Sequence, residues 1–208
     1  MIQWCQQLFG VFMSILKKNE YQKQLVEHAA ELYAILHKFF SNKRVVKVIK
    51  DHFPFDEEGT PADALMVACC QIMVHMANVD GKFTKEEVKV IKKVTGMEVD
   101  VEKAKSFSPT YFVNDAGVPL IAACACYAEE YFLQVDGKHH KVSDMLGQLL
   151  DLVASITIHA DGNSDMLEIL EKVHFMKNTH LFFAEYKRTH KAGYVVWAFN
   201  LDQYLPKQ

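Results

Sequence analysis

The sequence predicts an all-α protein, a helical bundle of two pseudo-repeated halves with a helical extension at each end. Three observations lead to this prediction. Apolar residues recur at three- and four-residue intervals along nearly the whole chain, which is the spacing of one helix face. The 208 residues include only 9 Gly and 5 Pro, so few long loops are expected. A short acidic frame also occurs twice, 81 residues apart, which indicates a duplicated unit.

The first segment, residues 2–16, is largely apolar. We interpret it as a packed amphipathic helix, because no basic segment precedes it and no small-residue cleavage site follows it, as a signal peptide would require. Contact with a membrane surface is the alternative. The residues that favour this alternative are Trp4, Phe9 and Phe12, followed by Lys17 and Lys18.

A stronger helical pattern covers Glu20–Phe40, and a shorter basic helix is expected over Asn42–His52. The basic residues of the shorter helix are interpreted as a solvated face. The next stretch, FPFDEEGTP at 53–61, holds two prolines and a glycine and is the clearest break in the chain. We therefore expect residues 1–58 to form an N-terminal helical extension.

The first half of the core is expected to hold two helices, Ala64–Val79 and Thr84–Val94. Thr60 or Asp63 can cap the first helix, with Pro61 in its first turn. Thr84 and Glu87 fit a capping box for the second helix. Gly96 is a suitable residue to end it.

The middle of the chain begins with a loop-like stretch at 106–117, which could also hold a short irregular helix. Val118–Leu133 is apolar on nearly all sides until its last turn, so it is expected to be the buried central helix. Asp136 and Gly137 are expected to close it.

The second half repeats the first. A helix over Val142–Ala160 is followed by another over Ser164–Phe175. With an offset of 81, the apolar positions of the two long helices pair in sequence order: Leu65, Ala68, Cys69, Ile72, Met76 and Val79 with Leu146, Leu149, Leu150, Val153, Thr157 and Ala160. We place the helical core at 59–177. Residues 178–208, including the aromatic-rich stretch His180–Leu205, are expected to pack back on it as a C-terminal helical extension.

Composition excludes several classes of protein. The net charge of −3 argues against a nucleic-acid-binding surface. The longest apolar run, Val118–Ala128, is too short to cross a bilayer, so no transmembrane segment is expected. The chain has 5 cysteines, four of them inside apolar runs, which favours buried thiols and a reducing, cytoplasmic location.

The acidic frame is the strongest candidate site. Asp80 and a glycine are followed by Glu87, and Asp161 and a glycine are followed by Glu168. Helix-corner chemistry explains most of this pattern, because a glycine ends one helix and a Thr or Ser begins the next. A divalent-cation site of the Ca²⁺ or Mg²⁺ class is the competing explanation, because hard cations prefer carboxylate oxygens.

Two details favour the cation. Asp80 and Asp161 stand at the C-terminal ends of their expected helices, where the helix dipole disfavours a negative charge. In the second copy Leu167 takes the capping-box position if Ser164 caps the helix, so capping does not explain Glu168. A calcium EF-hand is rejected, because its first ligand position would be Met76 in one copy and Thr157 in the other.

Motifs of the common enzyme classes are missing from the sequence. It contains no Gly-x-Ser-x-Gly elbow, phosphate loop, dinucleotide fingerprint or His-Glu-x-x-His pair. A metal-dependent hydrolase would need further His or Asp constellations, which the sequence does not show. We therefore expect a protein that is not an enzyme.

The stretches HMANVDGKFTKEEVKVIKKV and ITIHADGNSDMLEILEKV, each behind an apolar helix, resemble the TerB family of tellurite-resistance proteins. A related domain occurs in membrane-bound DjlA-type co-chaperones. The resemblance covers roughly residues 62–176. It implies an all-helical fold of two repeated halves and an acidic cluster thought to bind a divalent metal. The matching positions here are Asp80, Glu87, Asp161 and Glu168.

Two functions follow as hypotheses. The first is a non-enzymatic, TerB-like module that binds a divalent cation in a stress-response or envelope-associated role. The second is a metal-free helical adaptor that binds a protein partner through the aromatic tail or the first helix. The sequence specifies neither the partner nor the oligomeric state.

Overall fold

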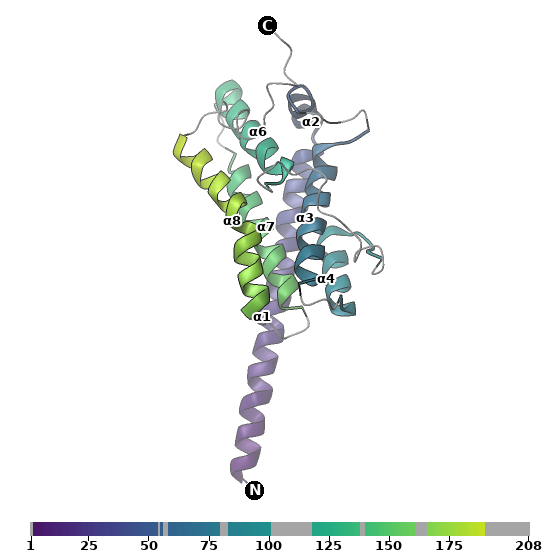
Figure 1. The fold of residues 1–208 in the computed structure, drawn as a ribbon, viewed down its shortest axis with the longest axis vertical. Coiled ribbons are helices and arrows are strands. Elements are labelled where there is room, and N and C mark those ends of the chain that lie inside the picture. The colour runs from purple at the N-terminus through teal and green to yellow at the C-terminus, as the bar shows by residue number, and fades with distance from the viewer. Residues whose placement is uncertain are drawn as a thin grey trace.

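The computed structural model describes residues 2–53, 55, 58–79, 83–100, 118–137, 140–160 and 166–189, with side chains described from residue 20 onward except at 168 and 189. The elements in these ranges are helices packed side by side (Figure 1). They are α1 (Ile2–Phe40), α2 (Lys43–Lys50), α3 (Pro61–Ala77), α4 (Lys85–Thr95), α6 (Leu120–Asp136), α7 (Val142–Ile158) and α8 (Met166–Thr189). The all-α prediction is confirmed for this part of the chain.

Helix α1 is one continuous element, whereas the sequence analysis treated residues 2–16 and Glu20–Phe40 separately. Lys17 and Lys18 separate the two apolar patterns, but they are good helix formers and do not interrupt the backbone. The C-terminal half of α1 packs into the bundle through buried residues such as Leu36 and Phe40. Its N-terminal part projects beyond the bundle at the opposite end from α2 (Figure 1).

The centre of the bundle is α7, not the segment Val118–Leu133 that the sequence favoured. Helix α7 packs against α1, α3, α4, α6 and α8. Helix α6 is also deeply buried, with every residue from Leu120 to Cys126 in the core. Low exposure of one helix therefore did not identify the helix with most neighbours, because the short side chains of α6, mainly Ala and Cys, are covered by few elements.

Local capping begins and ends the helices much as the sequence predicts. Thr60 caps α3 in a capping box with Asp63, and Pro61 occupies the first turn. Gly96 ends α4 and Gly137 ends α6, both with left-handed backbone at φ 75° and 63°. A glycine adopts this backbone without the steric cost that a Cβ atom brings.

The two long helices of the expected repeat match in length and position. Helix α7 begins and ends 81 residues after α3 does, and α8 begins 81 residues after α4. Of the six apolar positions paired by this offset, five are buried in both helices. The pairs are Leu65 and Leu146, Ala68 and Leu149, Cys69 and Leu150, Ile72 and Val153, and Met76 and Thr157.

Helix α8 runs unbroken from Met166 to Thr189, so the boundary placed at 177–178 falls inside a helix. Its second half contributes Phe182, Phe183 and Tyr186 to the same core that holds Leu36 and Phe40 of α1. The extensions at both ends of the chain, as far as the structure describes them, therefore share one hydrophobic core with the middle. The remainder of the expected C-terminal extension, 190–208, and the loop-like stretch 106–117 lie outside the described residues.

Candidate functional site

The four acidic residues of the repeated frame are described to different extents. Asp80 and Asp161 lie outside the described residues. Glu168 lies in the first turn of α8, but its side chain is also outside the described part. Glu87 alone among them has a described side chain, so the geometry of the frame is known at this residue.

Glu87 is a buried carboxylate that caps its own helix. It is 5% exposed in the first turn of α4. Its Oε2 atom accepts hydrogen bonds from the backbone N–H of Thr84 at 2.6 Å and from the Thr84 hydroxyl at 2.8 Å. The backbone N–H of Glu87 in turn donates to Thr84 Oγ1 at 3.3 Å. The predicted capping box is thus confirmed, and it holds this carboxylate in one place.

Glu168 takes the equivalent helical position. Helix α8 begins at Met166, so Glu168 is its third residue, as Glu87 is the third residue of α4. The sequence analysis assumed a start just after Ser164, which put Leu167 at that position. Ser164 and Asp165 both favour the residue before a helix, so the sequence does not choose between the two starts. One argument against a capping role for Glu168 is thereby removed.

The two corners of the repeat lie at one end of the bundle, the end from which α1 projects (Figure 1). A groove of about 350 Å³ lies there, and it brings Ala160, the residue before Asp161, to the first turn of α4 at Glu86. Helix α1 forms the other wall. Its Gln22 side chain donates a hydrogen bond to the backbone carbonyl of His159. The N-terminal extension therefore lies directly against the second corner.

Lysines surround the same groove. Lys23 of α1 and Lys89 and Lys93 of α4 line it together with Glu86. These lysines are matched by acids, because Lys89 pairs with Glu86 at 3.6 Å and Lys93 with Glu27 at 3.9 Å. Both pairs are exposed, so they contribute little to stability. Their charges nevertheless surround the end of the bundle where the acidic corners meet.

The described cysteines are core residues. Cys69, Cys70, Cys124 and Cys126 are buried and form no disulfide. Burial raises the pKa of the Cys69, Cys124 and Cys126 thiols well above the ordinary range, so these thiols stay protonated. Within the described residues, no group of three or more His, Cys, Asp or Glu side chains could hold a metal ion. The prediction that these cysteines fill the core is confirmed.

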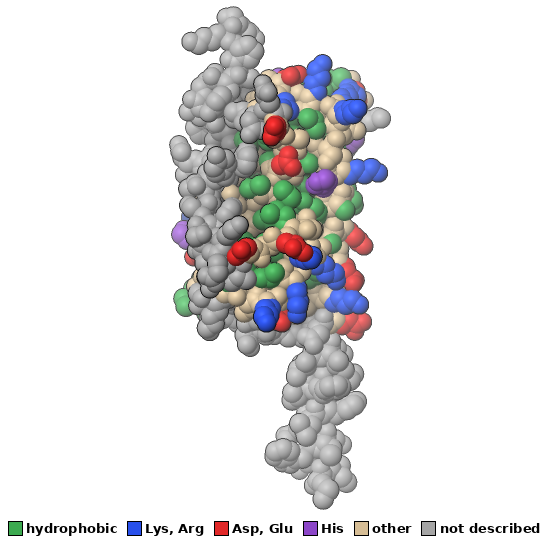
Figure 2. Space-filling model, turned by 90° about the vertical axis from the view of Figure 1, so that its right-hand side faces the viewer, with side chains coloured by type: hydrophobic (Ala, Val, Ile, Leu, Met, Phe, Trp, Pro, Cys, Tyr) green, Lys and Arg blue, Asp and Glu red, His purple; other side chains and the backbone are tan. Residues whose placement is uncertain are grey.

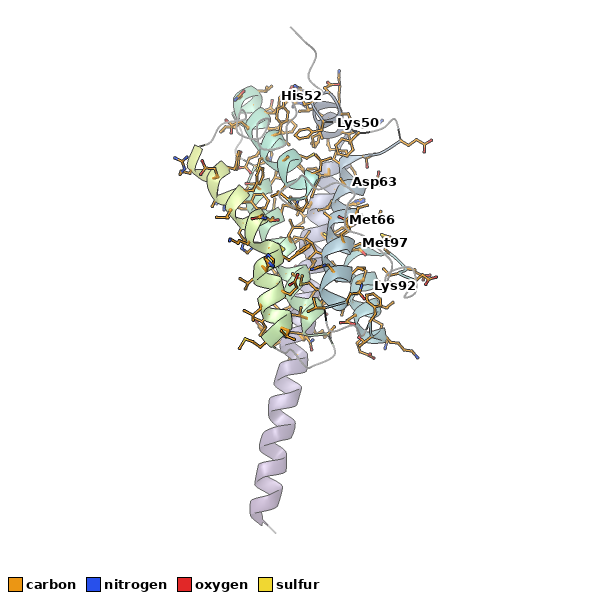
Figure 3. All side chains as sticks on the ribbon, viewed as in Figure 1. Lys50, His52, Asp63, Met66, Lys92 and Met97 are labelled. Atoms are coloured by element: carbon orange, nitrogen blue, oxygen red, sulfur yellow. The ribbon has the colours of Figure 1, made fainter. Side chains whose placement is uncertain are left out.

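The Cys70 thiol faces two other groups of the α3–α4 side. Its Sγ atom lies 3.6 Å from the Thr95 hydroxyl and 3.4 Å from Met97 Sδ. Met66 and Met97 lie on the same side of the bundle (Figure 3). Apolar side chains appear in the middle of this face between charged side chains above and below (Figure 2). Soft sulfur contacts of this kind fill irregular gaps in a core.

Sequence reasoning missed three polar contacts between helices. Glu129 in α6 bonds to Ser143 in α7, and His75 in α3 bonds to Glu171 in α8 at 2.9 Å. Arg44, interpreted from the sequence as part of a solvated face, makes two 2.9 Å hydrogen bonds to Asp136. A charged residue inside an apolar run, such as Glu129, is the one signal that could have indicated such a partner.

None of the described helices combines the length and hydropathy needed to cross a bilayer. Comparisons of the chain with protein-family models, curated proteins and solved structures found no match.

Proposed function

We propose that this chain is a non-enzymatic, TerB-like module that binds one divalent cation of the Ca²⁺ or Mg²⁺ class at its two acidic corners. Its ligands are Asp80, Glu87, Asp161 and Glu168. The role we propose is in a tellurite-resistance-like stress response or at the cell envelope. One observation carries the proposal: the helices flanking both corners start and end at positions related by the same offset of 81 residues.

That offset supports a duplicated corner rather than a chance match of two short motifs. The α3–α4 and α7–α8 connections each join the end of one helix to the start of the next across the same number of residues. The groove between α1, α4 and Ala160 also supports their proximity, because Asp161 follows Ala160 directly. Carboxylates contributed by two equivalent corners are typical ligands of a hard cation in helical proteins.

The capping role of Glu87 is compatible with a cation. A carboxylate that accepts two hydrogen bonds from Thr84 is held in its charged form and in a fixed orientation. Such preorganisation lowers the cost of ordering a ligand when an ion binds. In this proposal Glu87 caps α4 and binds the cation with the same carboxylate.

The same hydrogen bonds also favour the second candidate, a metal-free adaptor. If capping is the whole role of the frame, the corners are structural and function lies on another surface. The specific observation that favours this candidate is the row of exposed apolar residues on α8, of which Met166 and Leu167 are each 69% exposed. A partner protein could bind there.

Thermal unfolding with and without cations separates the two candidates. The wild type and the Asp80→Asn/Asp161→Asn variant are unfolded in chelator and then in Ca²⁺, Mg²⁺, Mn²⁺ and Zn²⁺ in turn. Binding at about 100 times Kd stabilises by about 2.7 kcal/mol, which raises Tm by roughly 5–10 °C in a chain of this size. The proposal expects this rise in the wild type and its loss in the double variant.

Glu86→Gln is the matched control. Glu86 lies in the same first turn of α4 but is outside the repeated frame, so this variant should respond to the cation as the wild type does. If no cation changes the Tm of the wild type, or if the double variant responds equally, the metal-free adaptor replaces the cation module.

A further inference from the structure

The N-terminal half of α8 carries an exposed apolar surface. Met166 and Leu167 are each 69% exposed, Leu170 is 56% exposed and Val173 is 63% exposed. Together with Ile169, at 41%, they form what we call the α8 surface. Their spacing places them on adjoining turns of the helix, so they form one patch. Contiguous apolar patches of this kind mark interaction sites on proteins that otherwise bury such side chains.

Specific polar contacts on the opposite side of α8 hold this surface outward. Glu171 accepts from or donates to His75 at 2.9 Å, and Lys172 donates to the Ser155 hydroxyl at 2.7 Å. Lys172 also pairs with Asp151 at 3.0 Å. The inner side of this half-helix is therefore polar and bonded to the bundle, while its apolar side faces away from it. In a single copy, the ordinary amphipathic arrangement is reversed.

Helix α1 leaves the bundle at the end where α8 begins. Gln22 bonds to the carbonyl of His159, next to the corner that leads into α8. Val26 is the first residue of α1 described as buried. From there toward Ile2 the helix continues beyond the bundle (Figure 1). Residues 2–19, which we call the α1 projection, span about 27 Å at 1.5 Å per residue.

The projection and α8 match in length and in pattern. From Met166 to Leu181, which is 57% exposed, α8 spans about 22 Å. The sequence of the projection has apolar residues at three- and four-residue spacing, at Leu8, Phe12 and Ile15. A helix that leaves the bundle without a break cannot return to the α8 surface of its own chain. The α8 surface that it can reach belongs to another molecule.

We propose that the chain forms a twofold dimer in which the α1 projection of each copy packs along the α8 surface of the other. The exchange is mutual, so the contact occurs twice and the assembly closes. Each copy contributes a projection and a receiving surface. Two such contacts supply the extent of a standard interface, roughly 800 Å² per partner, which the α8 surface alone falls short of.

Charge favours a second copy over a membrane surface. Helices that lie on membranes carry Lys or Arg along their polar side, where these residues attract anionic lipids. Residues 2–16 contain no charged residue, and their polar positions are Gln3, Gln6, Gln7 and Ser14. Neutral amides suit a protein surface at least as well, because Gln finds hydrogen-bond partners there.

Disulfide trapping tests the contact directly. Cys5 lies in the projection, whereas the four other cysteines are buried in the core. Met166→Cys, Val173→Cys and Leu181→Cys are made one at a time in the full chain and mildly oxidised. The proposal expects at least one of them to form a covalent dimer, and the same variant with Cys5→Ser to remain a single chain. Val135→Cys, on α6 and 54% exposed, is the control that should not cross-link.

Sedimentation equilibrium tests the dimer without cross-links. The wild type should have twice the mass of one chain, and Leu170→Glu/Val173→Glu should be monomeric with an unchanged far-UV spectrum. Val135→Glu should remain dimeric. A wild type that is monomeric at every concentration overturns the proposal. If that monomer binds vesicles of phosphatidylcholine and phosphatidylserine, the exposed surface is a membrane contact instead. Because these assays contain chelator, their outcome is independent of the cation proposal.

Discussion

Glu129 of α6 accepts hydrogen bonds from both the backbone N–H and the hydroxyl of Ser143, at 3.0 and 2.8 Å. Both residues are buried, and Ser143 lies in the first turn of α7. The residue before α7, Lys141, makes no capping bond with its side chain. Glu129 therefore supplies to the central helix, from a neighbouring helix, the cap that Thr60 and Thr84 supply locally to α3 and α4.

Loss of this contact should destabilise the fold. Glu129→Ala leaves the N–H and hydroxyl of Ser143 buried without their acceptor, which should lower the free energy of unfolding by about 2 kcal/mol. Ser143→Ala removes the hydroxyl but keeps the N–H bond, so about 1 kcal/mol is expected. Urea unfolding measures both. Gln134→Ala, at an exposed position of α6, should change stability by less than about 0.5 kcal/mol, and an equal loss there would contradict the capping role.

A glycine in the middle of α7 offers a stabilising substitution. A Cβ atom at Gly147 would lie 3.6 Å from Phe183 Cδ2, which is an ordinary van der Waals contact. Glycine in a helix interior costs about 1 kcal/mol relative to alanine, so Gly147→Ala should raise the free energy of unfolding by about that amount. Gly137→Ala is the opposite case. Its φ of 63° is strained for any residue with a Cβ atom, so that variant should lose about 1 kcal/mol. Thermal unfolding of the two variants should therefore shift in opposite directions.

The capping box of α4 can be tested by paired substitutions. Thr84→Ala removes the hydroxyl that bonds to Glu87 and should destabilise the protein by about 1 kcal/mol. Thr84→Ser keeps the hydroxyl and should be nearly neutral. Denaturant unfolding in chelator is the appropriate measurement, because it isolates capping from any cation. If alanine and serine behave alike, the hydroxyl does not stabilise α4.

The buried thiols predict a loss of stability in alkali. Burial holds the pKa of the Cys69, Cys124 and Cys126 thiols well above the ordinary value of 9.0. The unfolded chain loses these protons near that pH and the folded chain keeps them, so stability is full below it and falls as the pH rises. Each thiol adds a slope of up to about 1.4 kcal/mol per pH unit above about pH 9. Burial raises the pKa of Tyr33 and Tyr186 too, which adds to the loss in stronger alkali.

Unfolding in urea from about pH 7 to about pH 10 checks this slope. Cys126→Ala should make it shallower by the contribution of one thiol. The same burial makes the native thiols react slowly with an alkylating reagent, because the thiolate is the reactive form. Rapid labelling of Cys69 or Cys124 in the folded protein would contradict the burial described here.

Much of the local structure follows from short stretches of sequence. The starts of α3 and α4 at Thr60 and Thr84, and the ends of α4 and α6 at Gly96 and Gly137, were predicted to the residue. These positions depend on hydrogen bonds and backbone angles within about four residues, which the sequence shows directly. The start of α8 was placed too early, because Ser164 and Asp165 are equally good residues to precede a helix.

The candidate site was predictable in the same limited sense. The repeat of 81 residues identified the acidic frame, and the capping box correctly assigned a partner to Glu87. Sequence spacing did not indicate that Gln22, from the N-terminal extension, reaches the corner at His159. That contact joins residues far apart in the chain, and no local pattern specifies such a pair.

By itself, the sequence determined the all-helical class, the burial of the four core cysteines, the local caps and the equal spacing of the two halves. Each of these depends on periodicity or on neighbours within one or two helical turns. Only the tertiary structure decided that α7 is the central helix, that Glu129 caps it from α6, and that the apolar residues at the start of α8 face outward. These features depend on which helix faces meet, and that is decided by packing the whole core, because several faces of this chain are apolar enough to be buried.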